Sequence, residues 1–350
     1  MKNINDLHTT GKSSTNIQAR RIKGFGYQVL GFGAGGGASP FVEATGGTIS
    51  TDGDYKVHTF ASPATFTVLN AGDGEAANLV DYFVVAGGGG GGNNGYPQQR
   101  AGGAGGGGGF RLSNATGQVA APVMSPLSNP AGLAVTETGY PITIGAGGGG
   151  GQPASSSGQW DGYRGGDSIF SSITSTGGGG GSGHPLIGPS PPTVPAGPFP
   201  GGSGGGDTSP GRGGNDPPTS PPQGNNGGNG TAQPPATFSA GGGGGAGGVG
   251  GNSSGGSGGE GGIGSFVADA VGSATPTAYG TTGPVSNTRY FSGGGGGINA
   301  GGASPAGGGK AWQGGNCDDN SAGGGGGNQF SGGAAGNGGS GIVVLRYKFQ

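Results

Sequence analysis

The 350-residue chain contains 102 glycines, carries a net charge of −2, and has only 9% charged and 29% hydrophobic residues. An ordinary globular domain has about 45–50% apolar residues, so this composition excludes a conventional core of large side chains along the whole chain. The low net charge and clear strand patterns favour an ordered glycine-based fold over disorder, and the lack of a Gly-X-Y register excludes collagen. With Cys317 as the single cysteine, we expect no disulfide framework, and we expect neither a secretory signal peptide nor a transmembrane helix.

Basic residues are concentrated at the start of the chain. Five of the fourteen fall within the first 23 positions: Lys2, Lys12, Arg20, Arg21 and Lys23. The simplest interpretation is a solvated arm, and the sharper one is docking to an acidic partner protein. Nucleic-acid binding is not expected, because no aromatic platform or basic stripe follows downstream. We predict an attachment arm over residues 1–24, with Lys12, Arg20, Arg21 and Lys23 as its candidate contacts.

Residues 25–86 are predicted to form a small β-region. Residues 55–60 and 64–68 alternate polar and apolar side chains around Ser62-Pro63, which predicts a hairpin. His58 lies in the first of these alternating runs and is expected at the surface. Residues 82–86 are continuously apolar, which is typical of a buried strand.

Solid glycine blocks follow and define the rest of the chain. Blocks of five or six glycines occur at 87–92, 105–109, 147–151, 177–181, 241–245, 293–297 and 323–327. Their irregular spacing predicts a repeated element with loops of variable length. Glycine costs about 1 kcal/mol at each helical position, so almost no α-helix is expected.

Two further segments differ from the glycine blocks. Residues 184–237 are rich in proline among Ser, Thr, Asn and Gly, which predicts a long, solvated, polyproline-like insertion. Residues 341–350 contain a strong final strand, which we expect to pair back to the β-region. The predicted organisation is therefore an arm (1–24), a β-region (25–86), a bundle with display loops (87–340) and a C-terminal strand (341–350).

A glycine block can be ordered only through its amides, because it has no side chains to bury. In the extended helix with three residues per turn, N–H and C=O groups point outward and make no internal bonds. Without Cβ atoms, such helices can pack side by side and satisfy each other's amides. We predict a fold that is mostly β plus stacked polyglycine II helices, arranged as a glycine-rich sandwich or bundle.

The chain resembles a known class of phage protein over about residues 44–350. The resemblance rests on residues 47–60, on the apolar run 82–86 entering glycines 87–92, on 142–147, on 166–170 followed by glycines 177–181, and on the ending 339–347. These features look like the glycine-rich domain common in phage structural proteins, especially those of marine cyanophages. The pattern is also similar to the tip adhesin of T-even-type long tail fibres, in which polyglycine helices form a sandwich whose loops bind the host. The resemblance implies a protein of the virion, made in the host cytoplasm.

Catalytic and cofactor motifs are not supported. The many GxGxxG matches are inevitable in such a composition, and none lies between a strand and a helix. Gly11-Lys12-Ser13 has Asp6 where a P-loop needs its first glycine. Residues 317–320 could bind a cation, but a single acidic loop cluster is usually only solvated. We predict no enzymatic activity, catalytic residue, metal or cofactor.

Aromatic residues beside polar groups, next to glycine blocks, are the candidate receptor contacts. They are Tyr96, Arg100, Trp160, Tyr163, Arg164, Lys310 and Trp312. Such anchors commonly bind a carbohydrate or a protein receptor. The alternative interpretation is that they cap the open faces of the glycine stack.

The leading functional hypothesis is a fibre or tail-fibre adhesin whose loops contact a host-surface glycan or protein. Its arm would bind other virion proteins, and a trimer is compatible with a fibre; neither nucleic acid nor membrane insertion is expected. A purely architectural head fibre or decoration protein is the alternative. An ice-binding protein is the remote alternative, disfavoured by the irregular spacing of the blocks.

Overall fold

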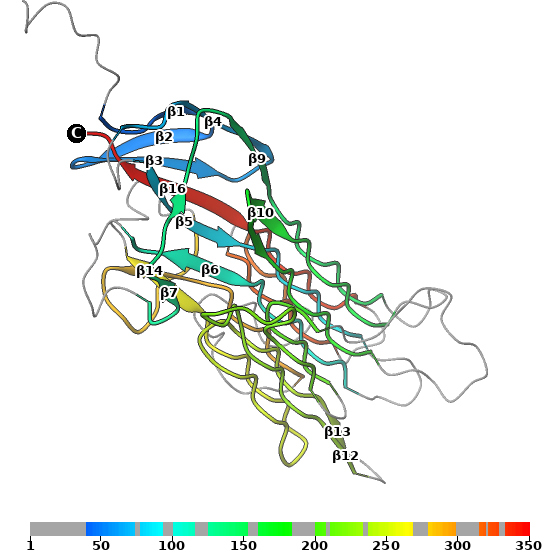
Figure 1. Cartoon of the computed structure of the whole chain (residues 1–350). Coiled ribbons are helices and arrows are strands. Elements are labelled where there is room, and N and C mark those ends of the chain that lie inside the picture. The colour runs from blue at the N-terminus through cyan, green and yellow to red at the C-terminus, as the bar shows by residue number, and fades with distance from the viewer. Residues whose placement is uncertain are drawn as a thin grey trace, which may run out of the picture. The chain divides into compact units, whose positions relative to one another are not determined.

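The computed structural model describes residues 40–73, 78–93, 101–115, 125–152, 160–183, 200–207, 211–233, 237–268, 279–298, 315–319, 321–328 and 333–350. All of these except Pro40 belong to one unit, Phe41–Gln350. Within these residues the protein is β-rich and contains no helix. Figure 1 shows the larger strands gathered together, with glycine segments running side by side away from them.

The larger sheet has seven strands. Their bounds are β2 Thr48–Asp52, β3 Tyr55–Phe60, β5 Leu79–Val85, β6 Phe110–Ser113, β7 Ser128–Asn129, β8 Leu133–Ala134 and β16 Ile342–Lys348. The order is β2-β3-β16-β5-β6-β7, with β8 beside β5, and only the β6–β7 pair is parallel. The final strand β16 lies between β3 and β5, with Ile342 opposite Val85. Both central strands therefore lead directly into or out of glycine segments, which fixes where those segments start.

A second sheet of five strands packs against this one. Its order is β1-β4-β9-β10-β11, with bounds Glu43–Thr45, Ala64–Asn70, Gly139–Thr143, Ser168–Phe170 and Ile173–Ser175. A cluster that includes Phe66, Phe170 and Leu345 fills the space between the sheets. A second cluster, which includes Phe83 and Phe291, covers the other face of the larger sheet. Because both of its faces are buried, the larger sheet has continuous apolar runs in β5 and β16.

Two hairpins complete the strands. β12 (Thr231–Gln233) pairs with β13 (Thr237–Ser239), and β14 (Ser265–Ala268) pairs with β15 (Thr288–Phe291), both antiparallel. In Figure 1, β12 and β13 lie at the end of the glycine segments away from β5 and β16.

His58 is fully buried, so the prediction of a surface histidine is wrong. Its Nδ1 lies 2.7 Å from the Gly46 carbonyl oxygen and its Nε2 lies 3.0 Å from the Tyr347 hydroxyl. A carbonyl can only accept, so Nδ1 carries the proton and Nε2 accepts from Tyr347. The Tyr347 oxygen accepts in turn from the Ala44 N–H at 3.2 Å. The alternating sequence pattern could not reveal the burial of His58, because the five-stranded sheet covers the face of β3 that would otherwise be exposed.

Stability should fall on both sides of neutral pH because of this network. Burial lowers the pKa of His58 below 6.5, so on acidification the unfolded chain binds the proton first. We expect the free energy of unfolding to drop below pH 6.5 by up to about 1.4 kcal/mol per pH unit, until the folded-state pKa is reached. Burial raises the pKa of Tyr347 from 10 to about 12, so stability should also fall between these values. Urea unfolding measured across this pH range checks both losses of stability. A His58→Gln variant that loses as much stability below pH 6.5 as the parent protein would show that His58 is not the group responsible.

The remaining described segments stack into what we call the glycine array. It comprises 86–93, 101–109, 145–152, 160–167, 176–183, 201–207, 211–216, 223–229, 240–253, 258–264, 292–298, 315–318, 321–328 and 333–341. These segments are joined by backbone hydrogen bonds between residues far apart in the sequence.

Segment 87–93 lies at the centre of the array and shows its rule. Every third amide donates to the same neighbour at 2.7–3.0 Å: Gly87, Gly90 and Asn93 to 160–166, Gly88 and Gly91 to 336–339, and Gly89 and Gly92 to 103–106. Its carbonyl oxygens accept from three other segments: 148–151, 178–181 and 325–328. One segment therefore bonds to six neighbours, whereas a strand in a sheet bonds to two.

Glycine is required here because there is no room for a side-chain atom. A Cβ added to Gly88 would lie 2.0 Å from the Gly323 oxygen, and one added to Gly90 would lie 2.0 Å from the Gly149 oxygen. These contacts are with backbone atoms that are themselves held by hydrogen bonds. Close approach of the segments thus depends on the absence of Cβ atoms, as expected for neighbours that share amide bonds.

The proline-rich stretch 184–237 differs from the expected solvated insertion. Segment 201–207 is buried, and its Ser203 N–H donates to the Gly107 oxygen at 3.1 Å. Segment 223–229 also joins the array, with Gly228 donating to the Gly242 oxygen at 2.8 Å. Short glycine runs inside this stretch therefore behave like the longer blocks. The prolines at 217, 218, 221 and 222 occupy the turn between two array segments.

Candidate functional site at the loop-bearing end of the glycine array

Several connections leave the array from one end, away from β5 and β16. The Asn93 N–H donates to the Trp160 oxygen at 2.7 Å, and the Gly151 N–H donates to the Gly91 oxygen at 2.8 Å. Asn93 precedes residues 94–100, and Trp160 follows residues 153–159. Both connections therefore begin or end at the same level of the array.

Three more connections are placed at this level by the residues beside them. The Asn93 Nδ2 group donates to the Gly333 oxygen at 2.8 Å, next to residues 329–332. The Gly183 N–H donates to Asp161 Oδ1, next to residues 184–199. The Gly327 N–H donates to the Gly296 oxygen at 3.2 Å, just before residues 299–314. We call this level the loop-bearing end.

Trp160 is the one aromatic receptor candidate found at this end among the described residues. It is half-buried, and its backbone lies so close to segment 177–183 that a Cβ on Gly183 would lie 2.3 Å from the Trp160 carbonyl carbon. Its indole Nε1 is buried and has no hydrogen-bond partner among the residues that the structure describes. A buried donor without a partner is uncommon, since leaving it unsatisfied costs about 1–3 kcal/mol.

Charged residues missed by the sequence analysis lie beside Trp160. Asp207 Oδ2 pairs with the Arg212 guanidinium at 3.0 Å, with the Asp207 side chain 7% exposed and that of Arg212 41% exposed. Burial raises the pKa of Asp161; the charge of Asp207 adds to this rise, while the Gly183 N–H and Arg212 oppose it. These two carboxylates could have been found from their positions in the sequence. Asp161 and Asp207 each directly adjoin a glycine, where a carboxylate can accept a hydrogen bond from a backbone N–H at the end of an array segment.

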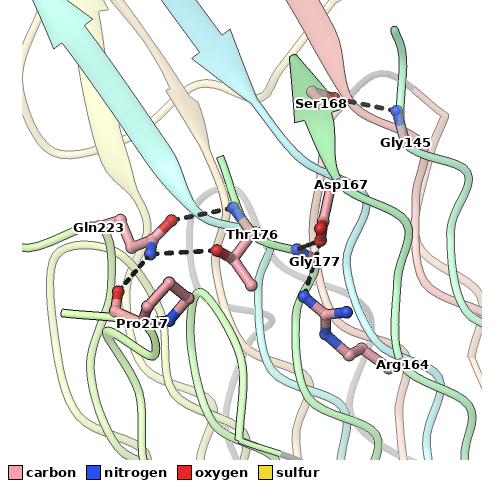
Figure 2. A network of polar contacts seen from close by, with 8 residues as sticks. All are labelled: Gly145, Arg164, Asp167, Ser168, Thr176, Gly177, Pro217 and Gln223. Carbon is pink, nitrogen blue, oxygen red and sulfur yellow. Dashed lines mark hydrogen bonds and ion pairs between the residues drawn. The ribbon is translucent and has the colours of Figure 1, made fainter. Parts of the chain in front are cut away.

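Tyr163 and Arg164 lie in the wall of the array rather than at its loop-bearing end. Tyr163 is 45% exposed, and its Cδ2 lies 3.5 Å from where a Cβ on Gly149 would be. Arg164 forms an ion pair with Asp167 Oδ1 at 2.7 Å, and the same oxygen accepts the Gly177 N–H at 2.8 Å. Figure 2 shows this network beside the bonds of Ser168 and Gln223 to neighbouring segments. Arg164 thus helps to orient the Asp167 carboxylate, which accepts the Gly177 N–H in place of a backbone carbonyl.

The other candidates lie outside the described residues. They are Tyr96, Arg100, Lys310 and Trp312, together with Lys12, Arg20, Arg21 and Lys23 of the N-terminal arm. The connections that contain Tyr96, Arg100, Lys310 and Trp312 nevertheless leave from residues at the loop-bearing end. Trp160 and the described residues that flank these connections therefore share one end of the array.

Metal-ligating groups do not cluster within the described ranges: no group of three His, Cys, Asp or Glu side chains is placed to hold a metal ion. The Cys317 Sγ lies 3.0 Å from Ser321 Oγ, and burial raises the pKa of this thiol. Across the same described ranges, no helix has the length and apolar character needed to cross a membrane.

The family model of the glycine-rich domain matches residues 62–348, which include most of both sheets and the whole glycine array. No curated protein matches the chain. Since the family model covers well over half of its length, the chain belongs to the glycine-rich domain family.

Proposed function

We propose that this chain is a phage virion structural protein, a fibre or tail-fibre adhesin in which a rigid glycine scaffold presents loops to the host surface. The observation that carries the proposal is that the residues flanking several connections gather at one end of the array, away from β5 and β16. A scaffold with its amides satisfied internally can hold loops in fixed positions, and loops on such scaffolds commonly carry binding residues. The resemblance to phage glycine-rich domains supports the same proposal.

We further propose that the array segments are polyglycine II helices. The three-residue repeat of partners along 87–93 matches three residues per turn, and six neighbours match side-by-side packing of helices that bond outward. At about 3.1 Å per residue, a six-glycine block would extend roughly 19 Å, enough to separate the sheets from the loops.

The two ends of this protein would have different partners. The basic arm with Lys12, Arg20, Arg21 and Lys23 would bind other virion proteins, and the loops would bind a host glycan or protein. In this proposal the chain is not an enzyme and needs no cofactor, because its role is to present the side chains of its loops to the host surface. Trp160 and the connections containing Tyr96 and Trp312 would supply aromatic anchors.

Substitution at the loop-bearing end should reduce adsorption. In virions carrying a Tyr96→Ala, Trp160→Ala and Trp312→Ala triple variant, we expect adsorption to host cells to fall about tenfold or more, because aromatic anchors dominate such interfaces. The matched control is Tyr163→Ala, which removes an exposed aromatic from the wall and should leave adsorption unchanged.

The architectural alternative makes the opposite prediction. For a head fibre or decoration protein, the triple variant and the control should adsorb equally, and purified chain should not compete with virions for cells. Virion preparations that lack the chain would contradict both versions. A thermal unfolding midpoint within a few degrees of the parent protein must accompany each comparison, so that misfolding is not mistaken for lost contact.

A further inference from the structure

Two neighbouring outer segments of the array expose residues that are three positions apart. Asn226 and Asn229 are exposed on one segment, and Val249 and Asn252 on the next. This spacing matches the three-residue repeat of hydrogen-bond partners in the interior. The exposed positions are therefore those on the outer surface of the array. An additional glycine segment would have to pack against these positions.

Asparagines occupy many of these outward positions, and their side chains accept amides from adjoining segments. Asn229 Oδ1 accepts the Gly211 N–H at 2.7 Å, Asn226 Oδ1 accepts the Gly214 N–H at 2.9 Å, and Asn252 Oδ1 accepts the Asn229 N–H at 2.8 Å. A second group repeats the arrangement elsewhere: Asn337 Oδ1 accepts the Gly150 N–H at 2.8 Å, and Asn316 Oδ1 accepts the Asn337 N–H at 2.9 Å. We call these five residues the asparagine rim.

In the interior the corresponding amides donate to carbonyl oxygens of a neighbouring glycine segment. On the rim, the side-chain carbonyl takes the place of that missing backbone carbonyl. Each rim asparagine also carries a Cβ on the outside. A Cβ at an interior position such as Gly88 or Gly90 would lie only 2.0 Å from a neighbouring backbone oxygen. A rim asparagine therefore does two things: it satisfies an outward amide and keeps another segment away.

We propose that the asparagine rim closes the array against docking of a glycine segment from a second copy of this chain. The array has no intrinsic limit, because each added glycine segment presents new outward amides, as the edge of a sheet does. Without the rim, the outer segments would offer a second copy the same surface that interior segments offer each other. The rim confines stacking to one chain.

Glycine and alanine substitutions separate this role from simple stabilisation. Asn226→Gly, Asn229→Gly and Asn252→Gly together remove both the amide acceptors and the Cβ atoms, whereas the matched alanine triple removes only the acceptors. We expect sedimentation velocity of the glycine triple to show about a twofold or greater rise in weight-average mass as concentration increases. The alanine triple and an aspartate triple, which keeps both acceptor and Cβ, should sediment like the parent protein.

Equal sedimentation of the glycine and alanine triples, both folded, would overturn the proposal. If the glycine triple does not fold, Asn316→Gly with Asn337→Gly provides an independent pair against its own alanine control. Hydrogen exchange at Gly211 and Gly214 gives a second readout. Both amides should exchange faster in either triple at low protein concentration, and association should slow them again only in the glycine triple. Faster exchange that persists in the associated glycine triple would also overturn the proposal.

Discussion

A Gly90→Ala variant is expected to lose about 3 kcal/mol or more of folding stability, a large fraction of the total for a typical domain, so its thermal midpoint should fall well below that of the parent protein. The new Cβ would lie 2.0 Å from the Gly149 oxygen and 2.4 Å from its carbonyl carbon. Neither atom can move alone, because the Gly149 oxygen accepts the Tyr163 N–H at 2.9 Å. Relief would require separating segments that are joined at the centre of the array.

Gly149→Ala is the matched control, since Gly149 lies in the block that Gly90 contacts. A Cβ there would meet only the Tyr163 ring, at 3.5 Å, an ordinary contact. This variant should keep its thermal midpoint within a few degrees of the parent. Comparable loss in the two variants would mean that glycine is needed for reasons other than close backbone approach. The comparison requires only thermal unfolding of two purified proteins.

Gln223→Leu should be the most damaging substitution of a polar side chain, costing about 3–5 kcal/mol. Gln223 is fully buried; its Oε1 accepts the Thr176 N–H at 2.9 Å, and its Nε2 donates to the Pro217 oxygen at 2.9 Å and to Thr176 Oγ1 at 3.2 Å. Figure 2 shows the Gln223 amide bridging Thr176 and Pro217. Leucine has a similar volume but leaves these groups without partners, and each buried unsatisfied group costs about 1–3 kcal/mol.

Gln152→Leu controls for the loss of a glutamine amide. Gln152 is exposed, and its Nε2 donates to the Gly150 oxygen at 3.1 Å, so water can replace the bond. Chemical denaturation should show less than about 1 kcal/mol of change for this variant. If Gln223→Leu were equally mild, the side chain would not be the bridge between Thr176 and the proline-containing turn at Pro217 that the geometry indicates.

The positions of several strands could be predicted from sequence because their side chains follow simple burial patterns. Their pairing could not: the predicted hairpin of 55–60 with 64–68 is wrong, since β3 pairs with β2 and β16 in the larger sheet and β4 pairs with β1 and β9 in the five-stranded sheet. The apolar runs at 82–86 and 342–349 contain the residues that pair as β5 and β16. His58 shows the limit of such reasoning, since alternation marks one face of a strand but not whether a second sheet covers the other. Hydrogen-bond partners among the glycine segments could not be assigned, because identical glycines carry no information about which neighbour they contact.

The described part of residues 184–237 also differs from what its composition predicted. Proline density indicated a solvated insertion, yet three- to six-residue glycine-rich runs such as 201–206 are enough to enter the array. At the candidate site, aromatic residues drew attention to Trp160, but the carboxylates of Asp161 and Asp207 were overlooked. Their roles depend on which backbone N–H groups lack a backbone acceptor where array segments end. That depends on how the segments pack in the glycine array and cannot be read from the local sequence.

The most direct test of this account is an experimental map of residues 87–93 and their surroundings, by crystallography or cryo-electron microscopy. The account predicts a left-handed extended helix with three residues per turn, surrounded by six segments, with Gly90 bonded to Tyr163 and to Gly181. A continuous β-sheet through the glycine blocks, in which segment 87–93 has only two hydrogen-bonded neighbours, would contradict it.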